Sequence, residues 1–374
     1  MNETLNKAII AHNEGRYIEA ELLYISTLKK QPKHPDILNN LAIVQIYNNK
    51  LEDAVKSFKK AIAINVNLED LHNNLGSCLQ NLNRFDESIA CYKKAIAIKP
   101  NYVAAYFNIS NALTKIEKFN EAIINYRKTI ELKPDYTEAH NNLGSVLHKL
   151  NRFEESFECY NKAIEINPDY FKAHNNLGNV LLKINKLDEA ILCFRKTITL
   201  KPDFAEAHNN LGSALQTLNK FDEALVSYNK AIDIKPDFAE AYNNLGSVLY
   251  KLKKFDQAIT YYNKALMLKP ELNEVLLNRG QFFFNKGEFD LAIKDFDKCT
   301  DVKAIIRSLY TLYSLNRIDD IYERIDKISE SNNENLAVAA FSSFIGHKNK
   351  KDTGNKFCKN PIDFISISNI SSHL

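Results

Sequence analysis

Glycine and proline are scarce in this chain, with 10 Gly and 9 Pro among 374 residues, and both recur at regular intervals. All-β proteins need turn residues scattered at short spacings, so this composition argues against them. Hydrophobic residues make up 45% and charged residues 25%, which excludes disorder as the main state. The composition therefore predicts a folded, largely helical protein.

The chain also has no large excess of positive or negative charge. Its 49 Lys and Arg residues nearly balance its 46 Asp and Glu residues, and the net charge is +3. Such a balance supplies no field that would hold nucleic acid or an anionic membrane. There is no apolar run of about 18 residues and no secretory signal at the N-terminus. Six cysteines without a CxxC pair indicate free thiols in a reducing compartment. We expect a cytoplasmic protein that binds neither nucleic acid nor membrane.

Catalytic motifs are absent as well: there is no G-x-G-x-x-G, no P-loop, no G-x-S-x-G and no H-E-x-x-H. The recurrent Gly-Ser pair, as in Gly144-Ser145, falls inside a predicted helix and not on a strand-to-helix elbow. We therefore expect no enzymatic activity, no cofactor, no metal and no small-molecule substrate.

What the chain does contain is a period of 34 residues. One phase of this period holds only Gly, Ala or Ser, at Ala8, Ala42, Gly76, Ser110, Gly144, Gly178, Gly212, Gly246 and Gly280. Taking this phase as position 8 gives nine repeats, which end at Ile306 and begin at Met1, Pro35, Glu69, Val103, Thr137, Phe171, Ala205, Ala239 and Asn273. A small residue is required at this phase.

The other recurrent positions describe a helical hairpin. Positions 20 and 27 are small, position 24 is always Tyr or Phe, and position 32 is Pro in seven repeats. Glycine inside a helix costs about 1 kcal/mol relative to alanine, so repeated glycines at position 8 indicate that a second helix passes close by. Asp203 with Glu206 predicts a capping box at the start of the first helix, and Asp237 with Glu240 repeats it.

Small residues at positions 8, 20 and 27, an aromatic at 24 and proline at 32 resemble the tetratricopeptide-repeat (TPR) family. The resemblance covers about 306 of the 374 residues. It implies an all-α fold, a right-handed TPR superhelical solenoid of stacked helix-turn-helix repeats. In such superhelices the first helix of each repeat, helix A, lines a concave groove that receives a protein or an extended peptide.

The candidate binding residues are the asparagines at position 6, which is Asn in all nine repeats. A carboxamide offers an acceptor and two donors, enough to hold both groups of a peptide backbone. The sequence pattern AHNNLG…FDEA is similar to the repeats in the TPR half of O-linked N-acetylglucosamine transferase, where groove asparagines hold substrate polypeptides. Either a peptide-binding column or a family-typical surface explains Asn6, Asn40, Asn74, Asn108, Asn142, Asn176, Asn210, Asn244 and Asn278.

Position 4 is histidine in four repeats, at His72, His140, His174 and His208. Metal ligands must all lie about 2 Å from one ion, whereas equivalent positions of stacked hairpins are about 8 to 10 Å apart. We therefore interpret these histidines as half-buried packing residues. Position 6 is never basic in the nine repeats, which argues against a clamp for the C-terminal carboxylate of a partner.

The period breaks after residue 306. We expect nine TPR repeats over 1–306, a degenerate hairpin and capping helix over 307–347, and a linker with a strand-like tail over 348–374. The predicted function is a non-enzymatic scaffold that binds an extended polypeptide. The strand-like tail motivates an alternative, in which the array is the substrate-recruiting arm of a glycosyltransferase or a 2-oxoglutarate oxygenase whose catalytic domain is missing or separate.

Overall fold

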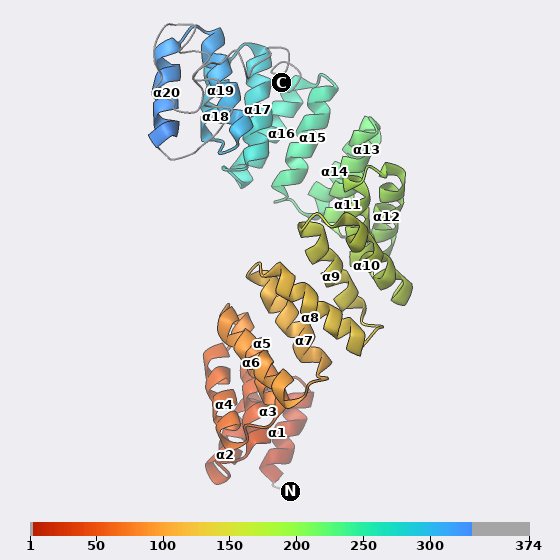
Figure 1. Cartoon of the computed structure of the whole chain (residues 1–374), viewed down its shortest axis with the longest axis vertical. Helices are drawn as coiled ribbons and strands as arrows, with labels where there is room; N and C mark the ends of the chain where they lie inside the picture. The colour runs from red at the N-terminus through yellow and green to blue at the C-terminus, as the bar shows by residue number, and fades with distance from the viewer. Residues whose placement is uncertain (1–2, 331–374) are drawn as a thin grey trace. The chain divides into compact units, whose positions relative to one another are not determined.

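The computed structural model describes residues 3–330, which contain twenty α-helices and no strand. The all-α prediction is confirmed. The chain divides into two compact blocks, the N-terminal block Met1–Pro202 and the C-terminal block Asp203–Leu374. In each block, successive helices form hairpins that pack against the next hairpin along the chain (Figure 1).

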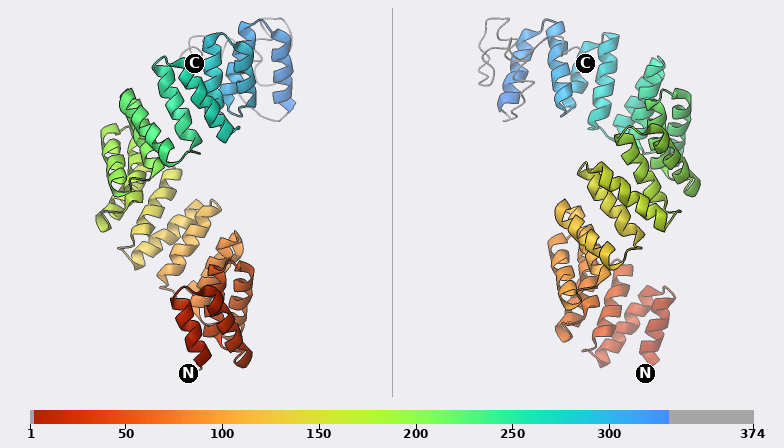
Figure 2. Two further views of the ribbon diagram at one scale, coloured as in Figure 1. Left: turned by 180° about the vertical axis from the view of Figure 1, so that it is seen from behind. Right: turned by 45° about the vertical axis from the view of Figure 1, so that its right-hand side comes forward.

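The helices of the N-terminal block are α1 (Glu3–Asn13), α2 (Tyr17–Lys30), α3 (Pro35–Tyr47), α4 (Leu51–Ile64), α5 (Glu69–Asn81), α6 (Phe85–Ile98), α7 (Val103–Lys115), α8 (Phe119–Leu132), α9 (Thr137–Lys149), α10 (Phe153–Ile166), α11 (Phe171–Lys183) and α12 (Leu187–Leu200). Those of the C-terminal block are α13 (Ala205–Thr217), α14 (Phe221–Ile234), α15 (Ala239–Lys251), α16 (Phe255–Leu268), α17 (Asn273–Lys286), α18 (Phe289–Lys298), α19 (Val302–Ser314) and α20 (Ile318–Glu330). Odd-numbered helices are the helices A, and even-numbered helices are the helices B. Figure 2 shows the same helical hairpins from two further sides.

The turn inside each hairpin depends on a left-handed residue at position 15, with φ between 57° and 79°. This conformation is costly for most side chains, while glycine and asparagine tolerate it. No prediction was made for this position from the sequence, although glycine or asparagine occupies it in most repeats. Its residues are Gly15, Asn49, Asn83, Glu117, Asn151, Asn185, Asn219, Lys253 and Gly287.

The small residue at position 8 makes room for the aromatic ring at position 24 of the same hairpin. A Cβ added to Gly144 would lie 2.8 Å from Cε1 of Tyr160, and one added to Gly178 would lie 2.6 Å from Cε1 of Phe194. Both rings are almost completely buried. The predicted contact between the helices is present, and the group that demands glycine is a ring of helix B.

The predicted capping boxes are wrong. Helix α13 has Phe204 as its N-cap residue, and no side chain caps the helix. The N-cap position is taken by the aromatic residue at the end of the preceding repeat, so Asp203 lies one residue too early. Glu206 instead forms an ion pair with Lys235 at 3.3 Å, at the other end of the same hairpin.

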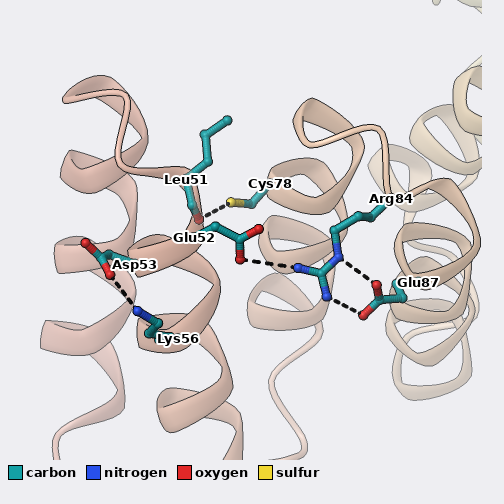
Figure 3. A network of polar contacts seen from close by, with 7 residues as sticks. All are labelled: Leu51, Glu52, Asp53, Lys56, Cys78, Arg84 and Glu87. Carbon is teal, nitrogen blue, oxygen red and sulfur yellow. Dashed lines mark hydrogen bonds and ion pairs between the residues drawn. The ribbon is translucent and has the colours of Figure 1, made fainter.

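Neighbouring repeats are also joined by polar contacts at the start of their helices B (Figure 3). Nη1 of Arg84 donates to Glu52 of the preceding repeat at 3.3 Å, and Nε donates to Glu87 at 2.6 Å. The Sγ of Cys78 donates to the carbonyl of Leu51 at 3.4 Å. The ion pairs are exposed, so they contribute little to stability.

A tenth hairpin follows the nine repeats and consists of α19 and α20. Helix α19 begins at Val302, five residues before the boundary expected from the sequence. Counted from Val302, the left-handed residue Asn316 again occupies position 15. The expected capping helix near 335–346 and the strand-like tail over 348–374 lie outside the described residues.

Candidate functional site

The asparagines at position 6 form a column on the helices A, which we call the asparagine ladder. From the second repeat to the ninth, each of these side chains is partly exposed. The eight residues are Asn40, Asn74, Asn108, Asn142, Asn176, Asn210, Asn244 and Asn278. Asn6 in the first repeat is exposed.

Most ladder residues donate a hydrogen bond to position 5 of the preceding repeat. The Nδ2 of Asn176 donates to Oδ1 of Asn141 at 3.0 Å. The same bond joins Asn74 to Asn39, Asn108 to Asn73, Asn244 to Asn209 and Asn278 to Asn243, at 3.0 to 3.2 Å. The ladder therefore links successive hairpins within each block.

One repeat shows how the ladder adapts when position 5 changes. In the fourth repeat this position is Phe107, which has no acceptor. Asn142 of the following repeat donates instead to Oδ1 of Asn111, at position 9, at 3.1 Å. In these six repeats position 6 thus reaches the outward face of the preceding helix A.

Four of the six asparagines at position 5 are more deeply buried than the ladder. Asn141 is 5% exposed and Asn243 is 1% exposed, and a buried amide is costly unless its polar atoms are hydrogen-bonded. Asn141 accepts from the next repeat and donates to Oδ1 of its neighbour Asn142 at 3.1 Å. Position 5 therefore holds the ladder in place.

These bonds reduce what a ladder residue can offer a partner. A carboxamide has two N–H donors and an oxygen with two lone pairs. Asn176 uses one N–H for Asn141, and its oxygen accepts from Asn175 at 3.5 Å. Within the described residues, Asn176 keeps one donor and one lone pair for an outside group, which is one donor fewer than the sequence suggested.

Tyrosine hydroxyls add to the same face. The ring at position 24 passes beneath position 8, and its hydroxyl reaches position 9 or 12 of helix A. Tyr160 donates to Oγ of Ser145 at 3.1 Å, and Tyr126 donates to Oδ1 of Asn111 at 2.6 Å. Burial raises the pKa of both tyrosines to about 12, so the hydroxyls are neutral at physiological pH. Around positions 6 and 9 the face presents uncharged amides and hydroxyls.

The histidines at position 4 tie the end of one repeat to the start of the next. The Nε2 of His140 lies 2.9 Å from the carbonyl oxygen of Pro134, and that of His174 lies 2.8 Å from the oxygen of Pro168. Since a carbonyl can only accept, Nε2 is the donor. Residues 3–330 contain no cluster of three His, Cys, Asp or Glu side chains that could hold a metal ion.

The cysteine thiols are poor nucleophiles. Burial raises the pKa of Cys159 and Cys193 to about 11, which keeps them protonated. Both are free thiols, as are the other cysteines of the described part of the chain. None of the helices described is both long and apolar enough to cross a membrane.

The fold is thus an all-α solenoid of stacked helical hairpins with a column of uncharged amides on the helices A. Comparison with protein families gives the same answer repeat by repeat. One TPR model matches residues 110–151, 144–185, 178–219 and 217–253, a second matches 69–102 and 239–272, and a third matches 35–66 and 274–305. The chain belongs to the tetratricopeptide-repeat family.

Solved structures with similar folds include several helical-repeat proteins. YrrB, described as a TPR protein with an unusual peptide-binding site, is 27% identical over 50% of this chain and 96% of its own, with a TM-score of 0.43. A chain of the APC/C hetero-tetramer Cut9–Hcn1 is 18% identical over 73% of this chain and 54% of its own, with a TM-score of 0.53. PilF of Pseudomonas aeruginosa is 19% identical over 57% of this chain and 97% of its own, with a TM-score of 0.51. The last two likenesses concern the fold alone, and no curated protein matches the chain.

Proposed function

We propose that this protein is a non-enzymatic interaction scaffold that holds an extended polypeptide against the helix A face, with the asparagine ladder contacting the peptide backbone. Membership of the TPR family supports the general role as a protein-binding scaffold. The observation that carries the specific proposal is the ladder itself: the same partly exposed amide, in the same register, in repeat after repeat.

The remaining capacity of Asn176 suits a peptide backbone. The one N–H and one lone pair that it keeps complement the C=O and N–H of an extended chain. Each such bond contributes about 0.5 to 1.5 kcal/mol, because both partners must first leave water. Affinity would therefore come from repetition over several hairpins and not from any single contact.

The bond between repeats also lowers the cost of binding. It fixes the orientation of the Asn176 amide through Asn141, itself 5% exposed. A donor that is already oriented loses less conformational entropy when a ligand arrives. The role of the ladder in stacking and its proposed role in binding are therefore compatible.

A pair of matched variants separates the two roles. The double substitution Asn108→Ala with Asn176→Ala removes two ladder amides together with their bonds to Asn73 and Asn141. The control, Asn73→Ala with Asn141→Ala, removes the same two bonds and leaves both ladder amides on the surface.

The assay uses 12-residue peptides selected by the wild-type protein from a random library, with affinity measured by fluorescence anisotropy. We expect the ladder variant to bind about tenfold more weakly, from two lost contacts of about 0.5 to 1.5 kcal/mol each. The control should stay within about twofold, although it loses at least as much stability. Equal weakening of both variants would assign the asparagines to stacking alone.

The alternative, a substrate-recruiting arm of a glycosyltransferase or a 2-oxoglutarate oxygenase, is motivated by the strand-like tail expected over 348–374, which lies outside the described residues. It would use the same face in the same way. Reading the genomic DNA beyond the codon for Leu374 tests it: a stop codon with no catalytic reading frame nearby would count against it.

A further inference from the structure

The ladder changes its chemistry at the tenth hairpin. Position 15 is the left-handed residue of every preceding repeat, and Asn316 has the same conformation with φ 56°. Counting back from Asn316, position 6 of this hairpin is Arg307. A positive charge therefore replaces asparagine at the end of the column in the C-terminal block.

Arg307 lies in a hollow between the ninth and tenth hairpins. The hollow is small, with a volume of about 70 Å³, and is lined by Gln281, Phe284, Phe296, Arg307, Tyr310 and Thr311. Gln281 and Phe284 occupy positions 9 and 12, where other repeats receive the tyrosine hydroxyl of position 24. Here position 24 is Phe296, which has no hydroxyl.

Two polar groups of the lining already have partners. Nε2 of Gln281 donates to Oδ1 of Asn285 at 2.8 Å, and Oγ1 of Thr311 donates to the backbone oxygen of Arg307 at 2.6 Å. The remaining walls are largely aromatic rings. No acidic residue lines the hollow.

The Arg307 guanidinium has no counter-ion within the described residues. Neighbouring arginines differ: in the same block, ion pairs of 2.5 to 2.7 Å join Arg279 to Asp295, Arg317 to Asp290 and Arg324 to Asp297. Burial lowers the pKa of Arg307, and Asp301 acts in the opposite direction without forming an ion pair. A partly desolvated cation of this kind gains most from an incoming anion.

We propose that the Arg307 hollow binds the carboxylate of an acidic side chain of the polypeptide held by the ladder, glutamate above all. The proposal rests on the proposed function. A guanidinium matches a carboxylate in a two-pronged bond. Aromatic walls suit the methylene groups of the side chain. A chain terminus would instead bring its own backbone amide against the rings of Phe284 and Phe296.

This site would give the scaffold a selectivity that the ladder lacks. Amides that bind a peptide backbone do not distinguish one side chain from another. A single charged hollow at the end of the column selects segments with an acidic residue and fixes their register on the repeats. Arg307 is thus a specificity-determining residue.

The test uses two libraries of 12-residue peptides with amidated C-termini, one with glutamate and one with glutamine fixed at the same central position. The proteins are the whole chain, the variant Arg307→Gln and the control Arg324→Gln. The control loses the same charge from α20, where Arg324 is ion-paired with Asp297 and does not line this hollow. Circular dichroism melts establish that all three are folded.

We expect the wild type and Arg324→Gln to bind the glutamate library about tenfold more tightly than the glutamine library, and Arg307→Gln to bind the two within about twofold. A preference that persists in Arg307→Gln, or that appears only with free C-termini, would overturn the inference. The double variant Asn244→Ala with Asn278→Ala distinguishes the two proposals. If this double variant weakens binding of both libraries and the wild type shows no preference for glutamate, only the Arg307 inference fails. If the wild type binds neither library, both proposals fail.

Discussion

Replacing Gly178 by alanine tests the packing that produces the 34-residue period. Helix α11 would gain about 1 kcal/mol of helix propensity from the change. The new Cβ, however, would lie 2.6 Å from Cε1, 2.8 Å from Cζ and 2.9 Å from Cδ1 of Phe194. Carbon atoms pack at about 3.5 to 4.0 Å, so the ring or the helix has to move by about 1 Å.

The ring has little freedom to move, because Phe194 is 0% exposed. Overpacking of this kind costs about 1 to 3 kcal/mol, which offsets the gain in propensity. We expect Gly178→Ala to destabilise the sixth hairpin by up to about 2 kcal/mol. In the second repeat the native residues already combine alanine at position 8 with phenylalanine at position 24. Ala42 and Phe58 are both 0% exposed.

Amide hydrogen exchange in α11 and α12 measures the local opening free energy, which suits a repeat protein whose hairpins can open separately. Phe194→Leu should remove the clash, so that adding Gly178→Ala in this background becomes neutral or stabilising. The control Ala42→Gly should lose about 1 kcal/mol from propensity. The reasoning is refuted if Gly178→Ala stabilises α11 in the wild-type background, or if its effect is the same with and without Phe194.

Two further predictions concern positions where one repeat departs from the others. Glu117 adopts φ 60° although it is neither glycine nor asparagine. Glu117→Gly should therefore stabilise the fourth hairpin by up to about 1 kcal/mol. Thermal melts measure the change, and the control Asn151→Gly should have a smaller effect. Asp295, with a 3% exposed side chain, pairs with Arg279 at 2.6 Å, so Asp295→Ala should cost about 3 to 5 kcal/mol. The double change Arg279→Leu with Asp295→Ser, which restores residue types that other repeats have at these positions, should recover most of that loss in urea unfolding.

The hairpins were predictable from the sequence because their cause is local and repeated. Position 8 needs a small residue wherever position 24 carries a ring, as Gly144 and Tyr160 do, so the requirement appears at the same phase in every repeat. Helix ends were less predictable. Asp203 and Glu206 match the pattern of a capping box, yet Phe204 takes the N-cap position and Glu206 pairs with Lys235.

The candidate site was predictable in its residues and not in its bonds. The sequence singled out position 6, but the bond from Asn176 to Asn141 joins residues 35 apart in different repeats. The offset between two stacked helices A decides which side chains meet, and a pattern within one repeat contains no information on that offset. The bond from His140 to the Pro134 carbonyl spans only six residues, but it depends on the path of the chain into helix α9, which the residue pattern does not specify.

The sequence by itself determined that this protein is a TPR array, because steric demands inside one hairpin recur every 34 residues and leave a visible period. Only the tertiary structure decided which hydrogen-bonding groups of a ladder amide remain available to a partner, because that depends on the hydrogen bonds between hairpins. It also decided that Arg307 continues the column, because the tenth hairpin breaks the period in sequence while the left-handed Asn316 keeps the register in space.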